Sequence, residues 1–234
     1  MNTIKTLGIL GGVGPGTTAK IYLSIVESFR KKAKNYPSII IWNLPFPFAI
    51  EKEVIVKGIN SQKMLPYLID GAQILEKAGA TFGILPCNTL HKYLEDIRKS
   101  VNIPFLSILD ESAAYLDSLN IKKVGILATK TTVTDRLYDG ALKIRGIETF
   151  YPDKKEQEAL DRTIIQLIEE KTKGNYNDAI AHACKALKKK GAQAILLACT
   201  DLQLSGSHIN IKIPIIDTTA ILINASVREL NKVK

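Results

Sequence analysis

Two stretches of the chain decide the fold, because they repeat one pattern at distant positions. Residues 79–89 read GATFGILPCNT, and residues 191–200 read GAQAILLACT. Each stretch begins with a glycine and runs through a mostly apolar segment to a cysteine eight positions later, Cys87 in the first and Cys199 in the second. Apolar segments without polar alternation are typical of parallel strands that are buried on both faces.

Further landmarks recur in the same order around these two stretches. The sequence LGIL at residues 7–10 resembles VGIL at residues 124–127, and an Ile-Pro pair follows each cysteine, at residues 103–104 and 213–214. Since any two strand–helix–strand units look broadly alike, a generic likeness is the alternative to a true repeat. The shared order of the landmarks favours the repeat.

Short apolar runs alternate with longer amphipathic segments along the chain, which predicts parallel βαβ units. The expected strands are at residues 7–10, 39–42, 82–85, 105–108, 124–128, 194–198 and 213–216. The expected helices are at residues 17–34, 61–78, 90–100, 110–119, 133–145, 155–171, 176–190 and 219–233.

The predicted fold class is α/β, with two similar Rossmann-like domains whose parallel sheets are related by a pseudo-twofold axis. We place an N-terminal domain at residues 1–105, a C-terminal domain at residues 106–217, and a closing helix at residues 218–234 that packs back on the first domain. Ligands of open parallel sheets bind beyond the carboxyl ends of the strands. Because Cys87 and Cys199 each follow such a strand, the two thiols are expected to approach one interdomain cleft from opposite sides. This cleft is the predicted active site.

The surroundings of the cysteines and of one histidine bear on their chemistry. At a strand end and helix start, exposed amide dipoles favour the thiolate form of a cysteine. Buried core thiols or a structural disulfide are the alternatives for Cys87 and Cys199; the duplicated setting argues against the first, and a reducing compartment against the second. Cys184 lies in an amphipathic segment outside the repeat, and we expect it to pack in the core. His91 either tunes the Cys87 thiol or lines the cleft, or is a capping or surface histidine.

A glycine-rich loop, GGVGPG at residues 11–16, follows the first expected strand. A dinucleotide fingerprint requires a third glycine and a P-loop requires a lysine where Thr17 stands, so both nucleotide motifs fail. Two interpretations remain. The loop either presents amides at a helix N-terminus that hold an anion such as a carboxylate, or it is a tight turn that needs glycine for its backbone angles.

Composition excludes several classes of protein. The chain has 234 residues, of which 46% are apolar and 24% charged, as in ordinary globular proteins. Three cysteines without C-x-x-C or zinc-ligand spacing predict neither a disulfide scaffold nor a metal site. The net charge of +9 is spread over many segments without interleaved aromatic residues, so we expect no nucleic-acid partner. No signal-peptide pattern or membrane-length apolar run is evident, which predicts a soluble cytoplasmic protein without a membrane partner.

Four motifs taken together resemble one protein family. They are GGVGP at residues 11–15, PCNTLH at residues 86–91, TKTT at residues 129–132 and ACTDL at residues 198–202. In this order they resemble the aspartate/glutamate racemase superfamily, and within it the aspartate racemase branch. The resemblance spans nearly the whole chain and implies two Rossmann-like domains with the site between them, a homodimer, and no cofactor.

The resemblance also implies an activity and its residues. The substrate would be a small acidic amino acid, aspartate or glutamate, and Cys87 and Cys199 would be the catalytic pair. Racemisation removes the α-proton from one face and returns a proton on the other, which two opposed thiols can do when one is ionised and the other protonated. The residues carried over as substrate-binding are Gly12, Asn88, Thr89, Thr129, Thr132, Thr200, Asp201, Lys171 and Lys52.

The chain departs from the family pattern in two places. Asp201 stands where family members often have glutamate, and residues 43–53 lack the arginine that often grips the side-chain carboxylate of aspartate. The positive charge would have to come from Lys52, Lys171 or Lys173. A lysine offers a single ammonium charge, and not the two parallel hydrogen bonds that an arginine makes to a carboxylate. The alternative hypotheses are therefore a related enzyme, such as a hydantoin racemase or a maleate-isomerase-like enzyme, or a non-catalytic protein that binds a carboxylate or phosphate.

Overall fold

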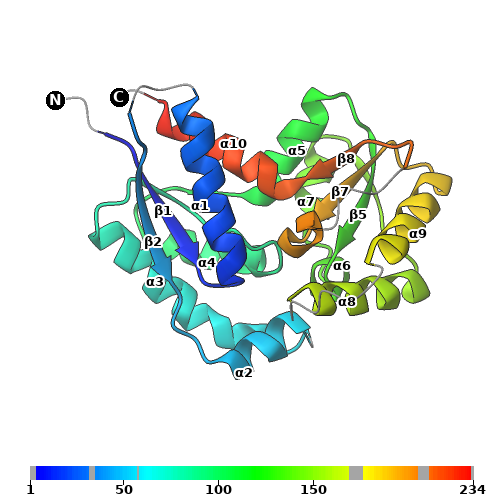
Figure 1. Ribbon diagram of the computed structural model, residues 1–234, viewed down its shortest axis with the longest axis horizontal. Coiled ribbons are helices and arrows are strands. Elements are labelled where there is room, and N and C mark those ends of the chain that lie inside the picture. The colour runs from blue at the N-terminus through cyan, green and yellow to red at the C-terminus, as the bar shows by residue number, and fades with distance from the viewer. Residues whose placement is uncertain (1–3, 32–34, 57, 169–175, 205–210, 233–234) are drawn as a thin grey trace. The chain divides into compact units, whose positions relative to one another are not determined.

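The computed structural model describes residues 4–31, 35–56, 58–168, 176–204 and 211–232 (Figure 1). The backbone divides into two compact units. The first consists of Met1–Glu111 and Thr219–Lys234, and the second of Ser112–Thr218. Each unit is built around its own four-stranded parallel sheet.

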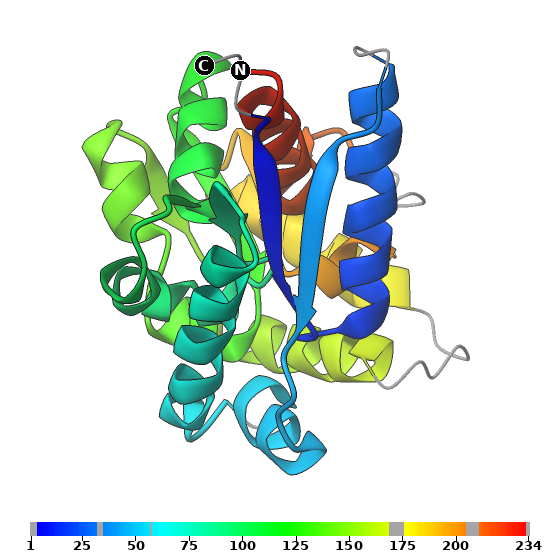
Figure 2. The same cartoon turned by 90° about the vertical axis from the view of Figure 1, so that its left-hand side faces the viewer.

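The first unit is a parallel sheet covered on both faces by helices. Its strands run in the order β2-β1-β3-β4 and are β1 (Thr6–Gly11), β2 (Ser38–Asn43), β3 (Phe82–Ile84) and β4 (Phe105–Leu106). Its helices include α1 (Pro15–Arg30), α3 (Leu65–Lys77), α4 (Leu94–Ser100) and α10 (Thr218–Leu230). Apolar residues of α1 and α10 pack on one face of the sheet, and those of α3 and α4 pack on the other (Figures 1 and 2).

The second unit repeats this plan. Its strands run in the order β6-β5-β7-β8 and are β5 (Lys123–Ala128), β6 (Glu148–Phe150), β7 (Ala194–Ala198) and β8 (Ile215–Asp217). Its helices include α6 (Lys130–Thr134), α7 (Asp139–Ile144), α8 (Lys154–Ile168) and α9 (Tyr176–Lys189). Helices α8 and α9 cover one face of the sheet with a shared apolar cluster. Helix α5 (Ile108–Ser118) begins in the first unit and ends in the second.

The two sheets have the same strand order, which confirms the predicted repeat. This order also indicates the edge of each sheet at which a ligand would bind. In each sheet the chain passes from the first strand to the second strand, which lies at one edge. It then crosses back to form the third strand on the other side of the first. The direction of winding therefore reverses between β1 and β3, and again between β5 and β7. Such a reversal opens a crevice beyond the carboxyl ends of the two strands, which is where α/β proteins bind ligands.

Several predictions of individual helices and strands are wrong. The expected helix at residues 133–145 is two short helices, because Arg136 adopts a left-handed conformation with φ of 49° between them. The expected strand at residues 105–108 ends at Leu106, since Ile108 already begins α5. Strand β6 and the helical turns between residues 48 and 56 were not expected at all. The end of the expected helix at residues 155–171 lies outside the described residues.

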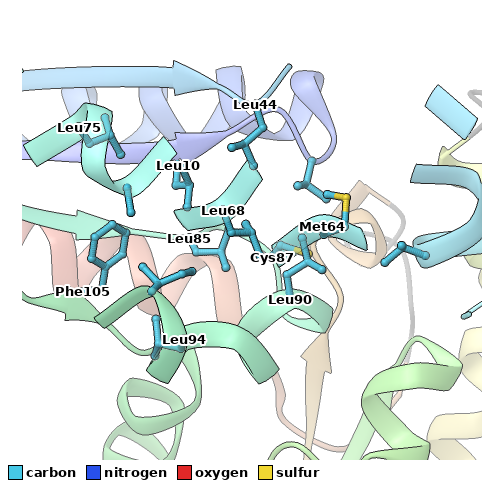
Figure 3. Close-up of a cluster of buried hydrophobic side chains, with 14 of the residues drawn as sticks. Leu10, Leu44, Met64, Leu68, Leu75, Leu85, Cys87, Leu90, Leu94 and Phe105 are labelled. Atoms are coloured by element: carbon cyan, nitrogen blue, oxygen red, sulfur yellow. The ribbon is translucent and has the colours of Figure 1, made fainter. Parts of the chain in front are cut away.

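Gly83 shows how tightly the first sheet packs next to the predicted site. Gly83 of β3 pairs with Phe105 of β4, and a Cβ atom on Gly83 would lie 2.4 Å from the Phe105 ring. Phe105 belongs to the apolar cluster in Figure 3 and is 2% exposed, so the ring has little room to move. Only glycine fits at this position without displacing that ring.

We expect Gly83→Ala to lower the free energy of unfolding by about 1–3 kcal/mol, the usual cost of overpacking a core. Urea denaturation monitored by circular dichroism measures this difference. Gly140→Ala is the matched control, because no heavy atom lies within 4 Å of its added Cβ and Gly140 lies inside helix α7. Alanine there should leave stability unchanged or raise it by up to about 1 kcal/mol. Equal stability of the two variants would contradict the packing of Gly83 against Phe105.

Candidate active site

The first half of the candidate site lies at the winding reversal between β1 and β3. The last paired residues of these strands are Ile9 and Ile84. Gly12 and Cys87 each come three residues beyond that pair, so both stand at the carboxyl edge of the sheet. Two residues that the sequence analysis selected are thereby brought to one edge by the register of the strands.

Gly12 shapes the loop after β1. Its φ of 96° lies in the region that favours glycine, and a Cβ atom there would lie 2.8 Å from the backbone nitrogen of Leu44. The amide of Gly12 donates a hydrogen bond to Oγ1 of Thr18, at 3.2 Å. For Gly12 itself, these contacts favour the tight-turn interpretation. The anion-binding interpretation would rest on the first-turn amides of α1, such as those of Gly16 and Thr17, for which a helix offers no backbone acceptor.

Cys87 lies at the end of the apolar cluster of the first unit (Figure 3). Its residue is 7% exposed, and its neighbours in the cluster include Met64, Leu85 and Leu90. The Cys87 amide donates to the carbonyl of Leu85, at 2.9 Å. A short 3₁₀ helix, Thr89–Tyr93, follows directly, and Asn88 and Thr89 are each 3% exposed. The predicted cysteine, asparagine and threonine therefore share one buried turn.

His91 resolves an alternative that the sequence left open. It is a buried histidine, 3% exposed, and both ring nitrogens are engaged. Nδ1 lies 2.7 Å from the carbonyl oxygen of Cys87, and Nε2 accepts a hydrogen bond of 3.0 Å from the amide of Ile108. Burial lowers the pKa of His91 to about 4, so the ring is neutral at physiological pH. His91 is thus a capping histidine, and not a surface one.

The second half of the candidate site lies at the reversal between β5 and β7. The last paired residues are Ala128 and Ala198, and Thr129 and Cys199 are the residues that follow them. Thr129 caps helix α6: its Oγ1 accepts a hydrogen bond from the Thr132 amide and lies 3.1 Å from Oγ1 of Thr132. Both threonines are buried. Their hydroxyls therefore have a structural task in addition to any contact with substrate.

Cys199 has a carboxylate as its neighbour. The residue is 5% exposed, and its Sγ donates a hydrogen bond of 3.7 Å to Oδ2 of Asp201. Thr200 and Asp201 begin a 3₁₀ helix, Thr200–Leu204, whose Leu202 amide donates to the carbonyl of Cys199. A carboxylate that accepts from a thiol favours the form of the sulfur that carries the proton. Asp201, predicted as a substrate-binding residue, is therefore also the partner of the Cys199 thiol.

Cys184 differs from these two cysteines in its setting, since it lies inside helix α9 and not at the end of a strand. It is fully buried in the cluster beneath α8 and α9, which confirms the prediction that it packs in the core. Burial raises the pKa of its thiol to about 12. All three cysteines are unbonded, so the disulfide interpretation is excluded for this structure.

Two residues that the sequence analysis missed brace the loop after β5. Nε2 of Gln157 donates to the carbonyl of Ala128 and to Oδ1 of Asp161, at 2.9 and 2.8 Å. The same Asp161 oxygen accepts from the Lys130 amide, at 3.1 Å, and burial raises the pKa of its carboxyl. Gln157 and Asp161 are four positions apart, which places both on one face of α8. That spacing is too common in helices to indicate a function from the sequence alone.

The structure describes only a part of the lysines that were proposed to supply positive charge for the substrate. The backbone of Lys52 lies in a π-helical turn, Lys52–Val56, and its side chain is outside the described part of the structure. Lys171 and Lys173 also lie outside the described residues. Among the residues that are described, no group of three or more His, Cys, Asp or Glu side chains is placed to hold a metal ion. No helix among them is long and apolar enough to cross a membrane.

Comparisons with known proteins identify the family of the chain. The family model of Asp/Glu/Hydantoin racemases matches residues 10–226. The chain is 32% identical over 226 residues to the broad specificity amino-acid racemase RacX of Bacillus subtilis, an alignment that covers 94% of this chain and 96% of that protein.

Two solved structures share the fold over nearly their whole length. An aspartate racemase homologue from Pyrococcus horikoshii has a TM-score of 0.81 and 28% identity, and covers 98% of this chain and 100% of its own. The aspartate racemase of Picrophilus torridus has a TM-score of 0.79 and 25% identity, with 98% and 96% covered. The chain therefore belongs to the Asp/Glu/Hydantoin racemase family and is an isomerase of that family.

Proposed function

We propose that this racemase interconverts the L and D forms of an acidic amino acid, aspartate or glutamate, without a cofactor, and that Cys87 and Cys199 exchange the α-proton. The observation that carries the proposal is the equivalent position of the two cysteines. Each follows the third strand of its unit, β3 or β7, at a winding reversal, and each is buried to more than nine-tenths. Cys184 is also buried, but it lies inside helix α9 and not at the end of a strand.

The chemistry of racemisation explains why two such thiols are required. A base must remove the α-proton from one face, and an acid must deliver a proton to the opposite face, so the two sulfurs must reach the α-carbon from opposite sides. One sulfur is thiolate and the other thiol, and the roles reverse with the hand of the substrate. The contact between Cys199 and Asp201 suits the protonated role for Cys199 before substrate binds.

The carbanionic intermediate concentrates negative charge on the α-carboxylate. Hydrogen-bond donors already aimed at that position lower the barrier most, because they need no reorganisation during the reaction. Asn88, Thr89 and Thr200 adjoin the two cysteines in sequence and are the proposed donors. The first-turn amides of α1, at the same edge as Cys87, are the second proposed source.

A broader substrate range is the second candidate. RacX is named for broad specificity, and residues 43–53 of this chain contain no arginine to select an acidic side chain. The aspartate racemase and its homologue among the solved structures favour aspartate instead. Since these observations point to different substrates, the substrate must be measured across a panel.

Incubation in D₂O tests both candidates together. We expect deuterium at the α-carbon and loss of optical activity with L-aspartate or L-glutamate, and no exchange with the protein omitted. Neutral and basic amino acids belong in the same panel, with chiral chromatography and mass spectrometry as readouts. Turnover of many side chains would support broad specificity, and turnover of aspartate alone would support the first candidate. Absence of exchange with every amino acid tested would refute the racemase proposal.

A further inference from the structure

His91 makes two contacts that together connect the Cys87 turn to the start of helix α5. Ser107 caps this helix, since its Oγ accepts from the Asp110 amide at 3.1 Å. Ile108 is then the first helical residue, and its amide lacks an acceptor within the helix. Nε2 of His91 supplies that acceptor from a different element.

The tautomer of the ring follows from these contacts. A backbone amide only donates, so Nε2 must carry a lone pair, and Nδ1 must carry the hydrogen. Nδ1 therefore donates to the Cys87 carbonyl, at 2.7 Å. Arg98 and Asp110 are the charged groups near the ring, and they act in opposite directions on its proton affinity; burial outweighs both and keeps the ring neutral.

The Cys87 carbonyl is a sensitive place for such a contact. Cys87 lies three residues beyond the last paired residue of β3, Ile84. The His91 ring and the bond from the His91 amide to the Asn88 carbonyl, at 3.1 Å, close a compact turn around Cys87. Rotation of the Cys87 peptide would change the direction of its Cα–Cβ bond and move the sulfur.

We propose that His91 is a positioning residue that sets the direction of the Cys87 thiol by holding the Cys87 carbonyl against the N-terminus of helix α5. This inference rests on the proposed role of Cys87 in proton transfer. His91 does not itself exchange the α-proton of the substrate, because both of its ring nitrogens are engaged and the residue is 3% exposed. Its effect reaches the reaction only through the geometry of Cys87.

Two substitutions separate the two contacts. In His91→Asn the amide nitrogen takes the place of Nδ1, which retains a donor for the Cys87 carbonyl and removes the acceptor for Ile108. In His91→Gln the amide oxygen reaches the place of Nε2, which retains the acceptor and removes the donor. Each variant loses one buried hydrogen bond, so we expect similar reductions in Tm, of about 5 °C.

The positioning role predicts different activities for these two variants of similar stability. His91→Gln should lower kcat about 100-fold with little change in KM, the cost of a misplacement of about 1 Å. His91→Asn should restore kcat to within about 10-fold of the wild type. His182→Gln is the control, because His182 is an exposed residue of α9 outside both halves of the site. Equal kcat values in the Asn and Gln variants would overturn the proposal.

A readout without turnover separates this inference from the proposed function. The rate of Cys87 alkylation by iodoacetamide, followed on its peptide by mass spectrometry, should change about 10-fold in His91→Gln and by less than threefold in His91→Asn. The Cys199 peptide should react at the wild-type rate in both. If the wild type fails to racemise, the proposed function fails, while the alkylation rates still decide the positioning role. Unchanged Cys87 alkylation in His91→Gln would overturn it.

The wild-type protein provides a further test, in which His91 is not replaced. Nitrogen-15 spectra at pH 7 should show a His91 ring protonated on Nδ1 and unprotonated on Nε2. Comparison with His182→Gln assists the assignment. A ring protonated on Nε2 would mean that the Ile108 contact does not exist, and would overturn the proposal.

Discussion

Replacing either Cys87 or Cys199 with serine is expected to lower the racemisation rate by about 10³-fold or more, the scale of a positioned acid or base. A serine hydroxyl ionises far less readily than a thiol, so it supplies neither the thiolate nor a matched acid at neutral pH. Both residues are buried and close in volume to serine, so the fold should survive. Chiral chromatography of product formed from each enantiomer measures the loss.

The two single variants should also differ from each other. Each retains one thiol, which reaches the α-carbon from one face only. That thiol can remove and return a proton on its own face, so one variant should exchange the α-proton of the L enantiomer and the other that of the D enantiomer, without inversion. Proton NMR in D₂O distinguishes exchange from inversion. Exchange of both enantiomers by one single variant would contradict the assignment of one thiol to each face.

Cys184→Ala is the matched control for both variants. Its side chain is fully buried beneath α8 and α9, and burial raises its pKa to about 12, so it supplies no thiolate. The substitution should lower the free energy of unfolding by about 1 kcal/mol or somewhat more through the cavity it leaves. It should leave kcat unchanged. Full racemisation by Cys87→Ser or Cys199→Ser, with this control also active, would refute the two-thiol mechanism.

The sequence predicted the central strands and the cysteines because these features are encoded locally. Continuous apolar runs form strands buried on both faces, and β1, β3, β5 and β7 are such strands. Because each run predicts where its strand ends, it also predicts that the cysteine after it lies at the end of the strand. The repeat of two runs then predicts the repeat of the sheet order.

The errors arose where tertiary contacts decide the structure. Strand β6 has three residues at a sheet edge, Glu148–Phe150, and its alternation is too short to detect. The break between α6 and α7 depends on a single left-handed residue, Arg136, which sequence patterns disfavour. The bridge formed by His91 depends on Ile108, 17 positions away, and no local pattern reports such a contact.

Gly12 and Thr129 illustrate a different limit. The sequence selected both as substrate contacts through the resemblance to a family. Their hydrogen bonds, from the Gly12 amide to Thr18 and between Thr129 and Thr132, stabilise the loops after β1 and β5. A residue in a motif can therefore stabilise the loop, bind the substrate, or do both, and the sequence alone does not distinguish these roles.

Acid is expected to destabilise the protein through His91 before the carboxyl groups are protonated. The pKa of His91 is lowered to about 4 in the folded state, chiefly by burial, and a histidine in the unfolded chain titrates near 6.5. Above pH 6.5 both states hold a neutral ring, and the histidine has no effect on stability. Between pH 6.5 and 4 the unfolded chain binds more protons, so stability falls as the pH falls.

The size of this effect follows from the pKa difference. A difference of about 2.5 units corresponds to about 3 kcal/mol once the pH is below the folded-state pKa, and to about 2 kcal/mol or slightly more at pH 4.5. Urea denaturation of the wild type at intervals from pH 7 to 4.5 records the loss. Asp161, whose pKa is raised, and Asp117, whose pKa is lowered, also shift the curve, so the wild type alone does not isolate His91.

His91→Asn isolates the contribution of the ring, because asparagine does not titrate and every other acidic group is retained. At pH 7 the variant should be less stable than the wild type, by about 1–3 kcal/mol, because it lacks the hydrogen bond from the Ile108 amide to His91. As the pH falls to 4.5, only the wild type bears the cost of a neutral buried imidazole, so the two free energies of unfolding should converge by about 2 kcal/mol. Curves that stay parallel over this range would mean that the ring becomes protonated in the folded protein. The Ile108 amide would then lose its acceptor in acid, and the link between Cys87 and helix α5 would not persist below about pH 6.5.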